Sequence, residues 1–414
     1  MSGARPTAVH HLTATSGTTR GAWRMLAILA IAELLAMSLW FTASAITPQL
    51  APRWGLSASN AAWLTGVVQL GFVCGTAASA VLNISDIVPA RQLFAISALL
   101  GAIANVCLIG VGSYSGALAC RFATGAALAG VYPPAMKMTA TWFYERRGLA
   151  IGAIVGALTL GKATPYLINA LGGGSIKPVI LATSAGAMLA AVIVLVLYHD
   201  GPHTFERRPF SWTLVREVVA LREWRLATGG YLGHMWELYA FWTWIGAFLV
   251  ASERSRGVAD GAPTVRLVGL LAYGAIGIGA FGCVWGGMLA DRIGHARLVT
   301  LALSASGACA LLAAGAFGGP LLLTAALAWT WGFWVIADSA QFSTLVTRSV
   351  PSHAVGTALT LQTSLGFLLT MASIQLVPLA AARSGWPASM ALLALGPAFG
   401  IMAVRSLRRQ EQAG

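Results

Sequence analysis

Long runs of apolar residues, separated by short polar stretches, make up most of the chain between Trp23 and Arg405. A helix needs ~20 mostly apolar residues to cross the hydrocarbon core of a membrane. The pattern therefore predicts an all-α polytopic membrane protein with twelve transmembrane helices. We expect these spans at residues 24–47, 57–82, 93–112, 115–140, 148–171, 178–198, 224–251, 265–289, 298–317, 320–346, 355–380 and 386–405.

The longest polar break divides the predicted spans into two sets of six. It contains Arg207, Arg208 and two prolines. The segment ELLAMSLW, which begins at Glu33, is also similar to ELYAFWTW, which begins at Glu237. Two parallel six-helix halves are the plan of many secondary transporters. We predict a disordered tail, an N-terminal half, a cytoplasmic linker, a C-terminal half and a second cytoplasmic tail at residues 1–22, 23–198, 199–223, 224–405 and 406–414.

The composition excludes a soluble globular protein. Hydrophobic residues make up 57% of the chain and charged residues 9%, whereas soluble chains usually contain ~25% charged residues. The 26 Lys and Arg against 13 Asp and Glu give a formal net charge of +13. Because these basic residues lie between apolar runs rather than on one solvated face, we expect a lipid bilayer around the protein and no nucleic-acid partner.

The basic residues also predict an orientation, because Lys and Arg are retained on the cytoplasmic side of a membrane. With the N-terminus inside, 17 of the 26 fall in the predicted cytoplasmic segments and six in the outer loops. We therefore expect both termini in the cytoplasm and a multi-pass protein of the bacterial cell inner membrane.

The segment GGMLADRIGHAR, Gly286 to Arg297, connects the eighth and ninth predicted spans. It resembles the loop signature of the major facilitator superfamily (MFS), Gly-x-Leu-Ala-Asp-Arg-x-Gly-Arg-[Arg/Lys], and departs from it at His295 and Ala296. Arg121 and Gly125, four residues apart in the fourth span, match a second feature of that family. The resemblance implies the MFS fold and secondary transport by alternating access.

The same resemblance implies a conformational latch on the cytoplasmic side, formed by Gly287, Asp291 and Arg292 in the second half and by Asp86 in the first. A carboxylate such as that of Asp291 can face a helix N-terminus and a neighbouring Arg, and so favour one arrangement of the halves. The alternative is a tight turn whose charges are simply solvated.

Motifs for catalysis, metal binding or cofactor binding are lacking in the sequence. The five Cys residues form no CxxC pair, and no HExxH, GxSxG or P-loop occurs. Residues Gly277 to Gly282 satisfy G-x-G-x-x-G, but they lie inside an apolar span with no preceding strand. We expect no enzyme activity, no metal site and no cofactor.

Charged residues inside the predicted spans are the main functional signal, because each costs roughly 2.5–3.5 kcal/mol at a helix centre. Three are acidic and three are basic: Glu33, Glu237, Asp338, Arg121, Lys137 and Lys162. Glu33 and Glu237 occupy equivalent positions of the internal repeat, each with an aromatic residue on the same helical face. We predict that Glu33 and Glu237, with His234, couple transport to protons. Alternatively, each Glu is satisfied by a neighbouring helix for packing alone.

Lys162 is the residue we predict to recognise the substrate. It shares a helical face with Thr159, Tyr166 and Asn169, and a buried ammonium needs an anionic partner. That partner is either a buried carboxylate or an anionic group of the substrate. We predict further substrate contacts from aromatic and charged residues inside the spans: Arg121, Tyr132, Tyr166, Trp40, Trp244, Trp334 and Asp338.

Together these features predict a monomeric, proton-coupled secondary transporter that moves a small organic solute, with an organic anion favoured. Its partners would be the small-molecule substrate and protons. The alternatives are an MFS exporter of drugs or metabolites, a copper importer, or a non-transporting membrane receptor on the same fold.

Overall fold

The computed structural model describes residues 16–143, 147–203, 211–258 and 262–413, and all regular structure in these ranges is helical. The first half of the chain contains α1 (Ser16–Met37), α2 (Thr42–Trp54), α3 (Ala58–Val81), α4 (Ile84–Ile87), α5 (Ala90–Cys107), α6 (Tyr114–Leu128), α7 (Tyr132–Trp142), α8 (Arg147–Leu171) and α9 (Ile176–Leu197). The second contains α10 (Trp212–Ala220), α11 (Arg222–Ser255), α12 (Ala262–Gly277), α13 (Gly279–Ile293), α14 (His295–Gly315), α15 (Leu321–Ala337), α16 (Ser339–Arg348), a 3₁₀ turn (Ser352–Ala354), α17 (Val355–Leu393) and α18 (Leu395–Ala413). The predicted all-α class is confirmed for this part of the chain.

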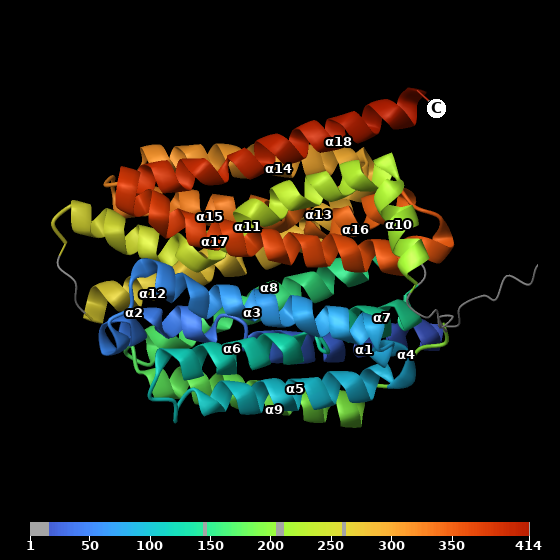
Figure 1. The fold of residues 1–414 in the computed structure, drawn as a ribbon, viewed down its shortest axis with the longest axis horizontal. Helices are drawn as coiled ribbons and strands as arrows, with labels where there is room; N and C mark the ends of the chain where they lie inside the picture. Colours follow the sequence, from blue (N-terminus) through green and yellow to red (C-terminus); the bar gives the residue numbers. More distant parts are fainter. Residues whose placement is uncertain (1–15, 144–146, 204–210, 259–261, 414) are drawn as a thin grey trace, which may run out of the picture.

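The helices form two stacked halves whose axes run along the length of the molecule (Figure 1). Helices α1–α9 make up one half and α11–α18 the other. The halves meet where α3 packs against α17 and where α8 packs against α12 and α13. The C-terminus and α10 lie at the same end of the molecule, opposite the end where α2 lies (Figure 1).

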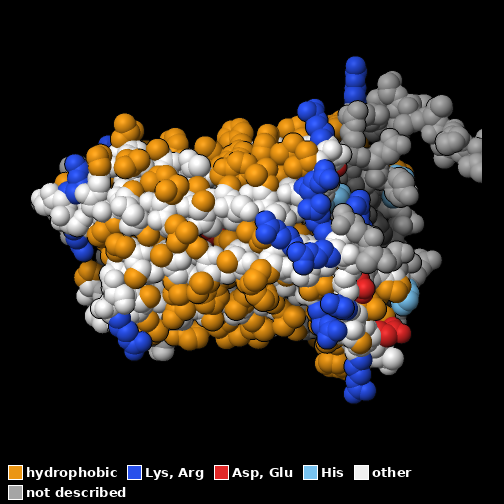
Figure 2. All heavy atoms as spheres, turned by 90° about the horizontal axis from the view of Figure 1, so that it is seen from above, with side chains coloured by type: hydrophobic (Ala, Val, Ile, Leu, Met, Phe, Trp, Pro, Cys, Tyr) orange, Lys and Arg blue, Asp and Glu red, His pale blue; other side chains and the backbone are white. Residues whose placement is uncertain are grey.

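The outer surface is apolar along the middle of the molecule and carries Lys and Arg near its ends, with most of the visible basic side chains toward the end that carries α10 (Figure 2). Phe281 and Leu322 are 72% and 82% exposed, which a water-soluble surface would not favour. Nine helical segments of the described residues are long and apolar enough to cross a membrane. The longest, Val355–Gln410, covers two predicted spans, and the count of twelve stays a prediction.

Several predicted spans are two helices in the structure rather than one. Helices α1 and α2 are separated at residues 38–41, α6 and α7 at 129–131, and α15 and α16 at Asp338. Between α6 and α7 the cause is local, because Pro133 and Pro134 supply no backbone N–H and restrict the preceding residues. The sequence pattern predicted continuous helices there because hydropathy does not register a break in hydrogen bonding.

Helices also extend beyond the predicted spans at both ends of the chain. Helix α1 begins at Ser16, inside the predicted tail of residues 1–22, and α18 continues to Ala413, through most of the predicted tail 406–414. Helix α10 forms within the predicted linker. Apolar length sets how much of a helix is in lipid, but backbone hydrogen bonding continues into the polar residues that follow.

Candidate functional site

Lys162 lies on α8, a helix that packs against the second half, and its ammonium is enclosed by aromatic side chains from both halves. Its Nζ lies 4.3 Å from the ring centre of Trp40, 4.6 Å from that of Tyr239 and 5.2 Å from that of Trp242. It donates a hydrogen bond to the Tyr239 hydroxyl, and the side chain is 1% exposed. Ring faces attract a cation, and the attraction strengthens when water is excluded. We call Trp40, Tyr239 and Trp242 the aromatic cage.

The aromatic cage also holds unpartnered hydrogen-bond donors. The indole N–H groups of Trp40 and Trp242 are buried and have no acceptor among the described residues. By contrast, the indole N–H groups of Trp244 and Trp331 each donate to a carbonyl or carboxylate oxygen. A buried donor without an acceptor is costly, so the cage is a place where an acceptor group would be stabilised.

Arg121 holds the irregular turn that carries Trp40. From α6 its guanidinium donates to the carbonyl of Leu39 at 3.0 Å, to the carbonyl of Trp40, and to Asn105 Oδ1 at 3.2 Å. These carbonyls lie where α1 has ended and α2 has not begun, so they lack the regular N–H partners of an unbroken helix. The carbonyl of Leu39 accepts a long bond from Thr42 N–H at 3.5 Å. Arg121 therefore stabilises the turn by replacing the missing backbone donors. Its predicted contact with substrate stays a prediction.

Glu33 is fully buried on α1, and neither of its carboxylate oxygens has a hydrogen-bond partner in the described part of the protein. Its carboxylate and the Lys162 ammonium act on each other electrostatically. The two residues flank the point where α1 and α8 cross, because a Cβ on Gly161 would overlap the carbonyl oxygen of Leu34. The crossing of these two backbones therefore sets the separation of the two charges.

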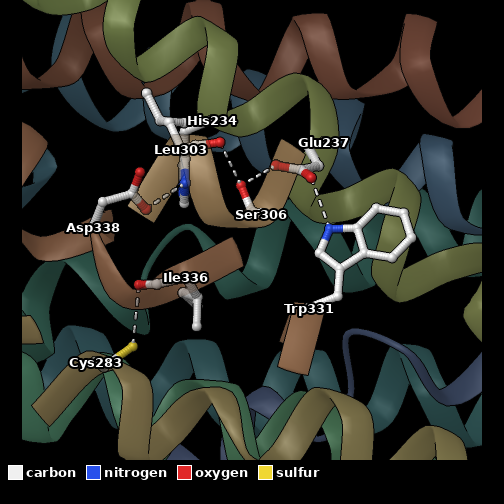
Figure 3. A network of polar contacts seen from close by, with 8 residues as sticks. All are labelled: His234, Glu237, Cys283, Leu303, Ser306, Trp331, Ile336 and Asp338. Carbon is white, nitrogen blue, oxygen red and sulfur yellow. Dashed lines mark hydrogen bonds and ion pairs between the residues drawn. The ribbon is translucent and has the colours of Figure 1, made fainter. Parts of the chain in front are cut away.

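Glu237, the counterpart of Glu33 in the repeat, lies in a different environment. Its carboxylate accepts hydrogen bonds from Ser306 Oγ at 2.8 Å and from Trp331 Nε1 at 2.7 Å (Figure 3). One turn earlier on α11, His234 Nδ1 lies 2.9 Å from Asp338 Oδ1, where α15 gives way to α16 (Figure 3). The side chains of Glu237, His234 and Asp338 are each 1% exposed. Glu237 is thus satisfied within its own half, whereas Glu33 is not.

The other predicted substrate contacts divide between the cage and more distant places. Tyr166 donates to the carbonyl of Trp242 at 3.1 Å and so joins α8 to the cage. Tyr132, at the start of α7, is half-buried. Trp244 donates to the carbonyl of Ile374 at 2.9 Å. Trp334 lines a lateral groove of about 410 Å³ between α12–α13 and α15.

The described residues show no contact of the predicted latch in this conformation. Asp291 and Arg292 are exposed, and neither makes an ion pair or side-chain hydrogen bond to the residues that the structure describes. Gly287 lies close to Gly148 of α8. The side chain of Asp86 lies outside the described side chains. The latch therefore stays a prediction for another arrangement of the halves.

Sequence reasoning missed most of the aromatic residues that surround Lys162. Tyr239 and Trp242 belong to the segment ELYAFWTW, which is aromatic on several faces, so helical periodicity could not select them. Phe72 and Phe367 pack on Trp40 with ring centres 5.1 and 5.3 Å away. Gln69, one turn before Phe72, is fully buried, and neither of its amide atoms has a hydrogen-bond partner in the described region. The sequence could have indicated this residue, because it is polar and lies inside an apolar span. No cluster of three or more metal-binding side chains occurs in the described ranges.

Comparison with known proteins agrees with this architecture. The family model described as Major Facilitator Superfamily matches residues 29–374. The chain belongs to the major facilitator superfamily. It is therefore a multi-pass membrane protein of a transporter family rather than an enzyme. No curated protein matches the chain by sequence.

Solved structures of MFS transporters are similar to this fold. A bacterial homologue of the human lysosomal transporter Spinster, in an inward-facing and unoccupied conformation, aligns with a TM-score of 0.72 at 14% identity, over 95% of this chain and 98% of that one. A point mutant of the nucleoside transporter NupG aligns with a TM-score of 0.67 at 14% identity, over 93% of this chain and 99% of that one. At this identity the likeness concerns the fold.

Proposed function

We propose that this MFS protein is a proton-coupled secondary transporter of a small organic anion. The observation that carries the proposal is the Lys162 site: a buried ammonium and two buried indole N–H groups without acceptors among the described residues, gathered where the two halves meet. Cationic and neutral donors in a low-dielectric site favour an anionic acceptor such as a carboxylate. The surrounding rings favour a substrate with a flat apolar body.

The location of the site suits alternating access. Lys162 and Trp40 belong to the first half, whereas Tyr239 and Trp242 belong to the second, so a substrate there would contact both halves at once. A group that contacts both halves can bias which arrangement they adopt, because its affinity differs between the two. Spinster-like and NupG-like proteins of the same fold are transporters, which supports movement of a solute rather than a receptor role.

We further propose twelve spans with both termini in the cytoplasm of a bacterium. The basic residues toward the end that carries α10 support this orientation (Figure 2). At the opposite end, Ser59 of α3 and Gln375 of α17 are hydrogen-bonded at 2.9 Å across the halves. That bond supports a conformation closed toward the outside, with Asp291, which has no ion pair among the described residues, at the cytoplasmic end.

Uptake into proteoliposomes tests the proposed function. The probes are benzoate, phenylacetate and indole-3-acetate, each compared with its neutral amide. We expect at least one carboxylate to accumulate when the medium is acidified, and no accumulation of the amides. Lys162→Ala should raise the half-saturation concentration of that carboxylate at least about tenfold, because a charge-assisted hydrogen bond is worth roughly 1.5–3 kcal/mol.

A matched control removes a cation away from the site. Lys177 is exposed on the first turn of α9, and Lys177→Ala should leave the half-saturation concentration unchanged. Lys162→Arg should recover part of the affinity, since it keeps the charge but not the shape. Unchanged affinity in Lys162→Ala, or preference for a cation such as benzyltrimethylammonium, would contradict the proposal.

A further inference from the structure

The positive charge of Lys162 has one acidic side chain, Glu33, as its nearby counter-charge in the described structure. Glu33 precedes Leu34 on α1 and Lys162 follows Gly161 on α8, at the point where the two backbones touch, and the two charges act on each other. No salt bridge joins the two side chains in the described structure. Instead the ammonium contacts the cage and the Tyr239 hydroxyl, which are neutral. The counter-charge of Lys162 is therefore close but not bonded to it.

Glu33 depends on Lys162 in turn. A buried carboxylate without hydrogen-bond donors is strongly disfavoured as an anion unless a cation is near. Helices α7, α8 and α9 pack against α1. The titratable groups on them include Lys162 of α8, Tyr132 and Lys137 of α7, and Lys177 in the first turn of α9. Of these, Lys162 is the one that acts on Glu33 electrostatically. Lys162 is thus the cation on these helices that favours the ionised form of Glu33, against the effect of burial.

The second buried cation near the site is already engaged. Arg121 directs its guanidinium toward the carbonyls of Leu39 and Trp40 and toward Asn105. Moving Arg121 to a substrate would take a donor from both buried carbonyls and leave that of Leu39 with the long bond from Thr42 N–H at 3.5 Å. One cation, Lys162, is therefore available to two possible anions, Glu33 and a substrate.

We propose that the substrate's carboxylate and Glu33 exchange as the counter-ion of Lys162, so that one proton accompanies each monovalent anion. This inference rests on the proposed function and adds its stoichiometry. In the proposed exchange, the substrate-free state that receives the anion has Lys162 protonated and Glu33 ionised. When the anion binds Lys162, Glu33 loses its counter-charge and takes up one proton from the water on the same side. One anion and one proton enter together, and the site carries the same net charge before and after binding.

The exchange predicts a specific effect of removing Glu33. In the unmodified protein, a carboxylate probe must bind together with a proton, so its affinity should fall with rising pH, by up to about tenfold per pH unit above the titration of Glu33. Glu33→Gln removes the competing anion. The variant should therefore bind the probe at about pH 8 at least tenfold more tightly than the unmodified protein, with less than about a twofold change in affinity between pH 6 and pH 8.

The binding experiment uses titration calorimetry of the purified full-length protein with benzoate, phenylacetate and indole-3-acetate. Glu253→Gln is the control, because Glu253 pairs with Arg256 at 3.0 Å, distant in sequence from the site, at the end of α11. It should keep the pH dependence of the unmodified protein. If Glu33→Gln does not fold, Glu33→Met provides a second uncharged side chain of similar length. A pH dependence that persists in the folded variant, or that disappears in Glu237→Gln instead, overturns the exchange.

Transport measurements test the charge balance separately. In proteoliposomes with a fixed pH gradient, a potential of either sign set by potassium and valinomycin should leave the initial rate of carboxylate uptake unchanged. Carboxylate uptake that responds to the potential overturns the one-to-one exchange but leaves the proposed anion transport in place. If none of the carboxylates binds or enters, or if the ammonium probe does, the proposed function itself fails.

Discussion

Gly161→Ala tests the helix crossing that sets the separation of Glu33 and Lys162. The glycine lies on α8 against the backbone of α1, and an added Cβ would overlap the carbonyl oxygen of Leu34. Backbone atoms on both sides of this contact cannot rotate away as a side-chain tip would. The two helices must therefore separate, by about 1 Å, to restore ordinary van der Waals contact.

The expected cost follows from that overlap. Forcing an extra carbon into a well-packed contact typically costs about 1–3 kcal/mol. Alanine also favours the helix over glycine by up to ~1 kcal/mol, which offsets part of the cost. Gly148, on the same helix, has nothing within 4 Å of its Cβ position, so Gly148→Ala carries the helix-propensity gain without the overlap. The difference between the two variants isolates the packing cost.

Unfolding in mixed detergent micelles, followed by circular dichroism, measures this difference. We expect Gly161→Ala to be less stable than Gly148→Ala by about 1–3 kcal/mol, and to transport a carboxylate probe more slowly because Lys162 shifts away from Glu33. Equal stability of the two variants would refute the argument, because it would mean that the crossing of α1 and α8 has room for a methyl group.

Four further predictions concern the hydrogen bond between α3 and α17, the break between α1 and α2, the loop after α13, and Glu237 of the internal repeat. Ser59→Cys with Gln375→Cys, in a background without the native cysteines, should form a cross-link that stops transport until a reductant is added; transport by the cross-linked protein would contradict closure at that end. Arg121→Lys should lower the free energy of unfolding by about 1–3 kcal/mol, because an ammonium cannot reach both buried carbonyls as a guanidinium does; an unchanged unfolding curve would argue against its role at the break. Asp291→Asn should change stability by less than about 0.5 kcal/mol, since the side chain is exposed and unpaired among the described residues, yet it should slow transport and raise cysteine accessibility from the cytoplasmic side. Glu237→Gln should lower the free energy of unfolding by about 1–3 kcal/mol through its two buried hydrogen bonds, and wild-type stability would show that these bonds contribute little.

Some residues of the site could be recognised from the sequence, because the free-energy cost of burying a charge depends on the residue and on the apolar span around it. A lysine or glutamate within an apolar span requires a partner wherever it falls, and this reasoning selected Lys162, Glu33 and Glu237. The partners themselves could not be derived in that way. Substrate contact by Arg121 stays a prediction, and the structure shows its guanidinium donating to carbonyls of a turn about 80 residues earlier in the chain, a contact that the sequence did not indicate.

The internal repeat in the sequence does not give its two glutamates the same hydrogen-bond partners. Glu33 and Glu237 begin similar segments and were predicted to act alike. Glu237 finds donors on α14 and α15, which neighbour α11, whereas Glu33 finds none in the described structure. Equivalent positions on two helices receive different neighbours because the surrounding helices differ in sequence.

Hydropathy and charge by themselves determined the helical class, the membrane environment and the division into two halves, because each depends on the sum of local transfer energies along a segment. The family resemblance rested likewise on two short contiguous patterns, one in a loop and one in the fourth predicted span. Only the tertiary structure decided where α1 and α2 separate and which rings enclose Lys162. The Tyr239 hydroxyl that accepts its hydrogen bond is 77 residues away in the chain, and contacts at such separations depend on how whole helices cross, which no local pattern encodes.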